Sequence, residues 1–167
     1  KALEAIKKQD CGWFYRASAF DFRKVPGNPI AYWISDRIRK LFTDCKNLGD
    51  IGSPRLGMAT GNNDIYVRNW PEVSLINIGF NCKSRKQAQQ SLKKWFPYNK
   101  GGPFRRWYGN NDHLVNWEND GDALQNTLHP SGNRIWAHNF NLEYIFRPCL
   151  SFTATSSSYF GIRYSSE

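Results

Sequence analysis

The 167-residue sequence predicts an α+β fold, with a mixed and mostly antiparallel sheet, short flanking helices and a single domain over residues 1–167. Helical periodicity is confined to two or three segments, and short apolar runs bounded by Gly, Pro and Asn are typical of strands. Strands and helices do not alternate as in a parallel βαβ fold, and no unit repeats at a fixed period. The apolar content of 40%, with 16% aromatic residues, suffices for a core.

The first third of the chain is predicted to hold two helices and an aromatic run. Residues 2–8 resemble the end of a helix, and residues 13–16 are strand-like. After a Pro- and Gly-rich turn at residues 25–29, Pro29 suits the first position of a helix that extends to Phe42. The apolar residues of this helix recur at helical spacing, which indicates a face buried in the core; they are Ile30, Trp33, Ile34, Ile38, Leu41 and Phe42.

The remainder is predicted to hold strands, turns and two further helices. A short helix should begin near Asn62 or Asn63, because either amide can cap it. A Gln- and Lys-rich exposed helix is expected at residues 84–94, and a turn or helix start at residues 119–122. Strands are expected at residues 48–51, 55–59, 73–80, 114–117, 135–137, 144–146 and 151–155.

Positive charge is concentrated in one stretch. The chain has 23 Lys and Arg against 14 Asp and Glu, a formal charge of +9. Residues 73–111 contain no acidic residue but eight cations, which are Lys83, Arg85, Lys86, Lys93, Lys94, Lys100, Arg105 and Arg106. Such a stretch repels itself unless it faces a polyanion or is spread over a solvated surface.

Aromatic and amide side chains alternate with these cations in residues 95–110. Cations neutralise phosphates, while planar rings stack on bases and Asn amides hydrogen-bond to base edges. The combination favours contact with a nucleic acid over the simpler alternative, a helix whose charges are only solvated.

No catalytic or metal-binding constellation is found in the sequence. Asn28-Pro29-Ile30-Ala31-Tyr32 resembles the Asn-Pro-Pro-Tyr loop of amino-methyltransferases, but two inserted residues break its spacing. There is no glycine-rich phosphate loop and no Phe-x-Gly-x-Gly segment that could hold a methyl donor. Asp112 with His113, and Asp120 with Asp122, are interpreted as loop residues. The four cysteines lack metal-ligand spacing, so we expect reduced thiols in a cytoplasmic protein and no metal site.

Residues 57–64, Gly-Met-Ala-Thr-Gly-Asn-Asn-Asp, form a more specific segment. Its Gly, Thr and Asn residues place flexible backbone and small polar groups at the start of a helix. Free N–H groups there can accept a phosphate, and Asn can pair with adenine through two hydrogen bonds.

Five motifs, in order along the chain, resemble the region that follows the catalytic domain in large bacterial adenine-specific DNA methyltransferases. These are the methyltransferases of the BREX phage-exclusion system and related type II restriction-modification enzymes. The motifs are Pro26-Gly27-Asn28-Pro29-Ile30-Ala31-Tyr32-Trp33, residues 57–64, Trp95-Phe96-Pro97-Tyr98-Asn99-Lys100-Gly101-Gly102, Phe104-Arg105-Arg106-Trp107-Tyr108-Gly109-Asn110, and Val115-Asn116-Trp117-Glu118-Asn119-Asp120-Gly121.

In that family the Thr-Gly-x-Asn segment lies in the target-recognition region, and the Asn-Pro-Pro-Tyr/Phe motif and the methyl donor lie upstream. The resemblance thus implies an excised target-recognition domain, truncated at both ends, that binds double-stranded DNA without a cofactor or catalytic residue of its own. The parent would be an S-adenosyl-L-methionine-dependent adenine-N6 methyltransferase, with or without restriction activity. Residues 151–163 would correspond to a later strand and Ser-rich turn, where Ser151-Phe152-Thr153 departs from the usual Ile-Thr-Trp.

Eleven residues are predicted to contact DNA. Lys100, Arg105 and Arg106 would bind phosphate or guanine, and Trp107 and Tyr108 would pack or stack. Thr60, Asn62 and Asn63 would form a loop close to the DNA backbone or to a base. The second-tier candidates are Arg55, Arg68 and Arg163.

Three other interpretations stay open at this point. The chain could be a protein-interaction module that docks to other defence-system subunits, a carbohydrate-binding module, or an active methyltransferase. The +8 stretch argues against the second, and the third requires binding of the methyl donor. No membrane partner is expected, because no apolar run approaches the roughly 20 residues that cross a bilayer.

Overall fold

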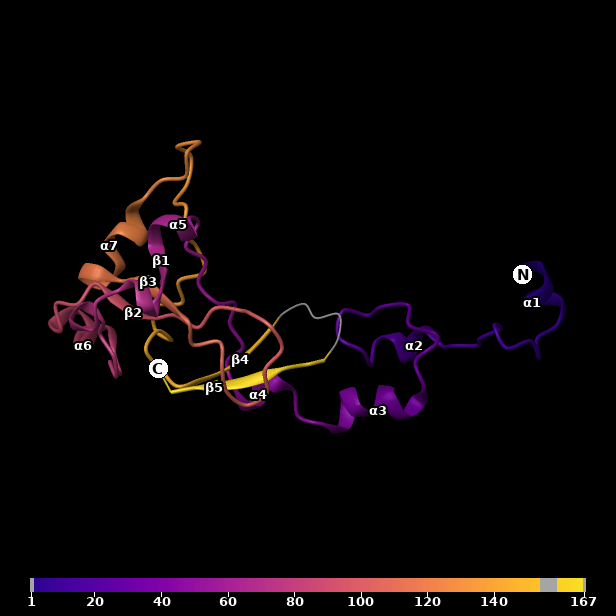
Figure 1. Ribbon diagram of the computed structural model, residues 1–167. Coiled ribbons are helices and arrows are strands. Elements are labelled where there is room, and N and C mark those ends of the chain that lie inside the picture. Colours follow the sequence, from indigo (N-terminus) through magenta and orange to yellow (C-terminus); the bar gives the residue numbers. More distant parts are fainter. Residues whose placement is uncertain (1, 154–158, 167) are drawn as a thin grey trace. The chain divides into compact units, whose positions relative to one another are not determined.

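A computed structural model describes residues 2–153 and 159–166. These residues belong to two compact units, residues 1–54 and residues 55–167, each considered by itself below. Helices and antiparallel sheets are both present (Figure 1), which confirms the predicted α+β class. That the chain forms one domain stays a prediction.

Short helices are the regular elements of the first unit: α1 (Ala2–Lys7), α2 (Ala19–Phe22), α3 (Asp36–Asp44) and α4 (Leu48–Ile51). The Ser18 hydroxyl caps α2 by accepting a hydrogen bond from the Phe20 N–H (3.2 Å), and the Ser35 hydroxyl caps α3 by accepting from the Ile38 N–H (3.4 Å). Serine is favoured at both positions because it satisfies an N–H group that has no partner within the helix.

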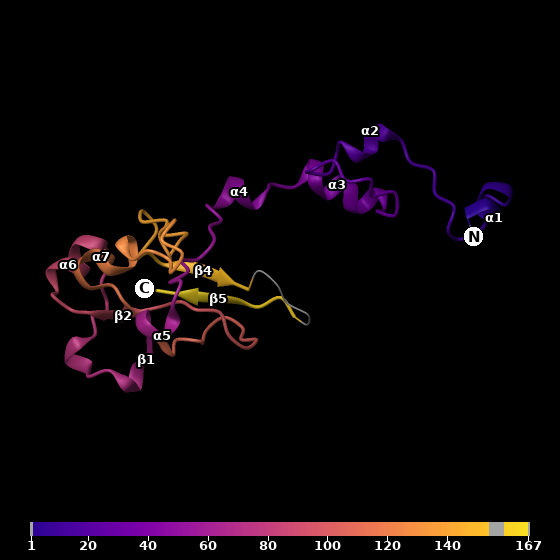
Figure 2. The ribbon, with the colours of Figure 1, turned by 90° about the horizontal axis from the view of Figure 1, so that it is seen from above.

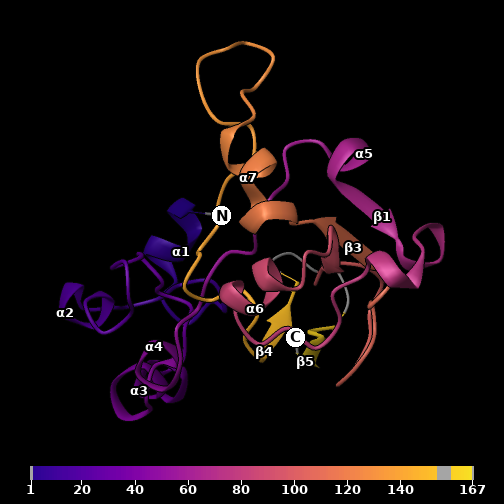
Figure 3. The ribbon, with the colours of Figure 1, turned by 90° about the vertical axis from the view of Figure 1, so that its left-hand side faces the viewer.

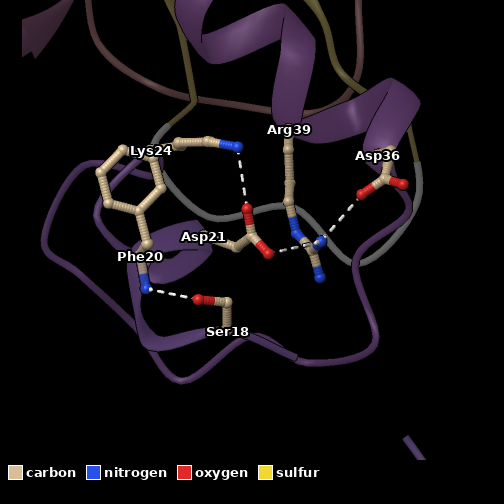
Figure 4. Close-up of polar contacts among 6 residues, drawn as sticks. All are labelled: Ser18, Phe20, Asp21, Lys24, Asp36 and Arg39. Atoms are coloured by element: carbon tan, nitrogen blue, oxygen red, sulfur yellow. Dashed lines mark hydrogen bonds and ion pairs between the residues drawn. The ribbon is translucent and has the colours of Figure 1, made fainter. Parts of the chain in front are cut away.

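Asp21 links α2 to α3 in this unit (Figure 4). Its carboxylate accepts from the Lys24 ammonium at 2.8 Å and lies 3.9 Å from the Arg39 guanidinium, which also pairs with Asp36 at 2.9 Å. The hydrogen bond from Lys24 is the main cause that lowers the pKa of Asp21. The ion pair of Asp21 with Arg39 thus joins α2 to α3.

Four predictions for the first unit are wrong. The helix that contains Ile38 begins at Asp36 and not at Pro29, because the Ser35 hydroxyl provides the N-cap. Its apolar residues are not core residues, since Ile30 is 71% exposed and Trp33 is 63% exposed. Residues 13–16 form no strand, and residues 48–51 form the helix α4 in place of the expected strand.

The second unit contains most of the strands and its own core. Its helices are α5 (Asn63–Tyr66), α6 (Arg85–Gln90) and α7 (Glu118–Asn126), with the 3₁₀ turns η1 (Trp70–Glu72) and η2 (Leu75–Asn77). Its strands are β1 (Val67–Asn69), β2 (Trp95–Pro97), β3 (His113–Asn116), β4 (Cys149–Phe152) and β5 (Ile162–Ser165). Helix α5 runs directly into β1 (Figure 3).

Two antiparallel sheets are formed. The first has the order β1-β3-β2, with Val115 of β3 opposite Val67 on one side and Phe96 on the other. The second pairs β4 with β5 (Figure 2). The sheet order places β3 centrally, and its residues Leu114 and Val115 are accordingly buried.

The core of the second unit lies between β2, β3, α6 and α7. Its buried members are Tyr66, Ala88, Phe96, Val115, Trp117, Leu124 and Ala137. The Phe96 ring meets the Phe146 ring edge-to-face, with centroids 5.5 Å apart. Gly121 has a φ of +73°, and a Cβ there would come within 2.6 Å of the Trp117 ring, so the start of α7 requires glycine.

Several local predictions for this unit are confirmed. Asn62 caps α5, Ser84 caps α6, and residues 114–116 lie in β3. The helix α6 nevertheless ends at Gln90, not at residue 94 as predicted. Residues 119–121 form a left-handed turn that starts α7. The strand expected at residues 151–155 is found as β4, although residues 154–158 lie outside the described part.

Other predicted strands are wrong. The apolar run at residues 73–80 contains the 3₁₀ turn η2, and residues 144–146 form a turn. Residues 55–59 and 135–137 contribute only the single bridges Ala59–His138 and Leu128–Ile135. These apolar runs contact the core from loops. They do so without forming a β-strand, and this is why the strand prediction was wrong.

Candidate nucleic-acid interface

All eleven residues predicted to contact DNA lie in the second unit. Nine of them fall into three groups: a loop that caps α5, a depression beside β1, and the loop of residues 98–111 that borders β5. Arg55 and Arg163 lie outside these groups. The three groups differ in how many of their polar side-chain atoms already form hydrogen bonds or ion pairs within the protein.

The loop before α5 uses most of its polar groups internally. The Asn62 side-chain oxygen accepts from the N–H groups of Asp64 (3.0 Å) and Ile65 (3.3 Å), as expected of an N-cap. The Thr60 hydroxyl donates to the Asn63 side-chain oxygen at 2.8 Å, and Thr60 is only 2% exposed. Gly61 has a φ of +74°, and a Cβ would lie 2.5 Å from the Trp136 ring. Thr60 and Asn62 therefore shape the loop, whereas Asn63 is exposed.

A shallow depression brings together three predicted residues, Asn63, Arg68 and Lys100. Arg68 donates from Nη1 to the carbonyls of Asp64 and Val67, both at 2.7 Å, and its guanidinium lies 5.4 Å from the centroid of the Trp95 ring. Asp64 and Glu72 line the same depression, so it carries both signs of charge.

The loop of residues 98–111 presents the most exposed predicted residues. Trp107 is 72% exposed and Tyr108 is 70% exposed, and both Arg105 and Arg106 are exposed beside them. The Arg106 guanidinium lies 5.6 Å from the centroid of the Phe104 ring. No carboxylate within residues 2–153 and 159–166 pairs with Lys100, Arg105 or Arg106.

This loop is held at its base and at its tip. Buried Asn110 donates from Nδ2 to the Pro103 carbonyl at 3.1 Å, which closes the base. At the tip, the Trp107 N–H donates to the Ile162 carbonyl at 2.8 Å, and the Tyr164 N–H donates to the Trp107 carbonyl at 2.9 Å. Two exposed rings and two arginines are thus presented from a fixed backbone, which lowers the entropy lost on binding.

The basic stretch is less repulsive than its sequence indicates. Arg85 binds the Asp120 carboxylate through both Nε, at 2.9 Å, and Nη2. Lys94 lies 3.4 Å from the Glu118 carboxylate. The hydrogen bonds to Asp120 raise the pKa of Arg85. Both acids lie just beyond residue 111, so the fold supplies counter-charges for two of the eight cations.

Each second-tier arginine either forms hydrogen bonds within the protein or is buried. Arg55 donates to the Tyr144 hydroxyl at 3.1 Å, and Arg68 is bound as described above. Arg163 is only 4% exposed, and its Nε has no hydrogen-bond partner within the described part of the chain. None of the three presents a free guanidinium on the surface as Arg105 and Arg106 do.

The structure also reveals a cavity of about 310 Å³ that sequence reasoning did not single out. Tyr108 is the one predicted residue in its wall, and Tyr98 and His113 line it as well. The signal in the sequence was weak, because residues 70, 98, 108 and 113 are brought together only by the pairing of β1, β2 and β3.

Within the residues that the structure describes, no three His, Cys, Asp or Glu side chains gather into a group that could hold a metal ion. The cysteines at positions 11, 45, 82 and 149 form no disulfide bond among the described residues. No helix in the described residues is long and apolar enough to cross a membrane.

No family model matches the chain. Over 164 residues, or 98% of the chain, it is 41% identical to the adenine-specific methyltransferase PglX of Lacticaseibacillus casei (strain Zhang). It is 33% identical over the same length to the adenine-specific methyltransferase BrxX of Escherichia coli O9:H4 (strain HS).

The match covers only a small part of each relative, 14% of PglX and 12% of BrxX. The chain is therefore homologous to one segment of large adenine-specific methyltransferases. The resemblance inferred from the five motifs is confirmed at this level.

Proposed function

We propose that the chain is the DNA-binding, target-recognition part of an adenine-N6 DNA methyltransferase of the BREX phage-exclusion or restriction-modification type. The observation that carries the proposal is the loop of residues 98–111, which holds Arg105, Arg106, Trp107 and Tyr108 exposed on a hydrogen-bonded backbone. Cations without acidic partners supply phosphate contacts, and the rings supply stacking surfaces. Both homologues are named adenine-specific methyltransferases, which supports adenine as the methylated base.

The methyl donor, S-adenosyl-L-methionine, does not fit the residues of this chain. The sequence has no Phe-x-Gly-x-Gly segment, and both sheets within the described residues are antiparallel, so they offer no strand–loop–helix crevice of the parallel kind. We propose that other parts of the parent bind the donor and transfer the methyl group, while this part positions the DNA.

The test is duplex binding by the 167-residue chain at a series of salt concentrations. Each phosphate contact contributes about −0.9 to the slope of log K against log salt. The double variant Arg105→Ala/Arg106→Ala should flatten the slope by about 1.8 if both residues contact phosphates. The matched control Lys83→Ala/Lys86→Ala removes the same charge from the start of α6 and should change the slope by less. Equal changes in both variants would refute a localised contact.

A second candidate function is a protein-interaction module that docks to other defence-system subunits. It is favoured by the first unit, in which Trp33, Ile38, Leu41 and Phe42 are all more than 40% exposed. This function predicts no salt-dependent DNA binding but a stable complex with a partner subunit. The salt series therefore separates the two candidates.

A further inference from the structure

We propose that the 310 Å³ cavity of the second unit receives an unstacked nucleobase of the bound DNA. The proposal rests on the DNA binding proposed above. The cavity lies where β1 and η1, the end of β2, the start of β3 and the end of β5 meet. Its aromatic and polar lining residues include Trp70, Phe80, Tyr98, Tyr108, Asn111 and His113.

The aromatic walls of the cavity suit a flat ligand. Trp70 is 48% exposed, Phe80 is 46% exposed and Tyr108 is 70% exposed, so the core does not bury these residues. Ligand cavities begin at about 300 Å³, which limits this one to a small molecule or a single base. Aromatic side chains bind bases by stacking without regard to sequence, because every base has a π-face.

Two polar side chains in the wall have hydrogen-bonding capacity to spare. The Nδ1 atom of His113 is buried and has no hydrogen-bond partner within the described residues. Asn111 is exposed, and its side chain forms no hydrogen bond in that same part of the chain. Nearly all buried polar atoms are hydrogen-bonded, and this Nδ1 atom would gain a partner from a base only if the His113 ring turned toward the cavity on binding. The edge of a base offers both donors and acceptors to an imidazole and an amide.

The backbone fixes His113 at the edge of this cavity. His113 begins β3 opposite Asn69 of β1, and its carbonyl accepts from the Tyr98 N–H at 2.9 Å. The Tyr98 hydroxyl in turn donates to the Met58 carbonyl at 2.5 Å. The backbone of His113 is therefore held in place before a ligand arrives.

Tyr108 connects the cavity with the basic loop. It lines the cavity, while Arg105, Arg106 and Trp107 directly precede it in the exposed loop. A duplex held by the arginines would thus lie next to the opening, and a base that left its stack would have a short path into the cavity. Leaving the stack is least costly for a base that is mismatched or unpaired.

The experiment compares three duplexes of the same sequence: fully paired, with one bulged adenine, and with an abasic bulge at the same position. The abasic duplex bends similarly but lacks the base. Binding to the 167-residue chain is measured by fluorescence anisotropy. We expect the bulged adenine to bind at least about fivefold more tightly than the abasic bulge, because one base–aromatic stack is worth at least that factor. With 2-aminopurine as the bulged base, binding should quench its fluorescence.

Two neighbouring variants separate the cavity from the general surface. Tyr108→Ala removes a wall of the cavity and should reduce the fivefold preference to about onefold. Trp107→Ala removes an equally exposed ring outside the cavity wall, so it should weaken all three duplexes alike and keep the preference. Neither ring is buried, and circular dichroism checks that both variants fold.

Two results would overturn the cavity proposal alone: equal affinity for the adenine and abasic bulges, or a preference that persists in Tyr108→Ala. In both cases binding of the paired duplex would leave the proposed function standing. Failure of the chain to bind any of the three duplexes would overturn the proposed function and this inference with it.

Discussion

Trp107 lies directly beside Arg163, in a parallel bridge that joins the loop of residues 98–111 to β5. Arg163 is paired on its other side with Ser151 of β4. The Trp107 backbone thus occupies the place of a third strand in the C-terminal sheet. Its ring stays 72% exposed, whereas the Arg163 residue is covered.

Burial of Arg163, which has no counter-charge among the described residues, should affect the stability of the fold. Arg163 is 4% exposed and forms no ion pair with any described residue, so its burial is not offset by a counter-charge. Replacing buried charge with an apolar side chain of similar length is often neutral or stabilising. We expect Arg163→Met to leave the free energy of unfolding unchanged or to raise it by about 1 kcal/mol, as measured by urea denaturation. Exposed Arg134→Met is the control, and a large loss in Arg163→Met would reveal a partner for the guanidinium.

Asn62 should behave as a helix cap. Asn62→Ala removes the acceptor for the N–H groups of Asp64 and Ile65, and we expect a loss of about 1 kcal/mol. Asn62→Asp keeps an acceptor at the N-cap and should retain the stability of the parent chain. Thermal denaturation of the two variants distinguishes them; equal losses would mean that the cap contributes nothing. If the Asn62 amide also reads a base, Asn62→Asp will lose DNA affinity while it keeps its stability.

Asp120 should contribute more to stability than its neighbour Asp122. Its carboxylate accepts from Arg85 and, at 3.3 Å, from the Trp117 indole, whereas Asp122 accepts only from Asn126 among the described side chains. The pair is partly exposed, so solvent reduces its strength. We expect Asp120→Asn to cost about 1–2 kcal/mol and Asp122→Asn much less, by chemical denaturation. Similar costs at both positions would show that the contact with Arg85 is not what ties α6 to α7.

Stability at alkaline pH should depend on Tyr98. Burial raises the pKa of its hydroxyl, so the folded chain holds this proton more tightly than the unfolded chain. The resulting stabilisation is complete below the unfolded pKa of about 10 and is lost as pH rises through the folded value. The variant Tyr98→Phe has no hydroxyl to ionise, so it does not lose this stability at high pH. It also lacks the hydrogen bond to the Met58 carbonyl. The stability difference between the two proteins should therefore shrink above about pH 10, and parallel pH profiles would contradict the assignment.

Local signals in the sequence predicted some elements well. Ser84 and Asn62 are side chains that cap helices by short-range hydrogen bonds, and both helices are found where those residues indicate. The α+β class followed from the same short-range pattern. Helical spacing alone was misleading at Ile30 and Trp33, because the Ser35 cap starts the helix later than Pro29.

Long-range pairing could not be predicted from the sequence. Residues 95–97 were interpreted only as part of a DNA-contacting run, yet they form β2, and Phe96 is 1% exposed in the core. The partners of Arg85 and Lys94 likewise lie in a different segment, at Asp120 and Glu118. The cavity around His113 depends on the register of three strands, which no local pattern specifies.

The hydrogen bonds between Trp107 and β5 have a consequence for chimaeras between relatives. A loop is usually exchanged between relatives as one contiguous segment of sequence. Here the segment around Trp107 takes its backbone geometry from Ile162 and Tyr164, which lie far along the chain. A graft of residues 98–111 into a related protein would therefore keep this backbone geometry only where the recipient offers a strand equivalent to β5.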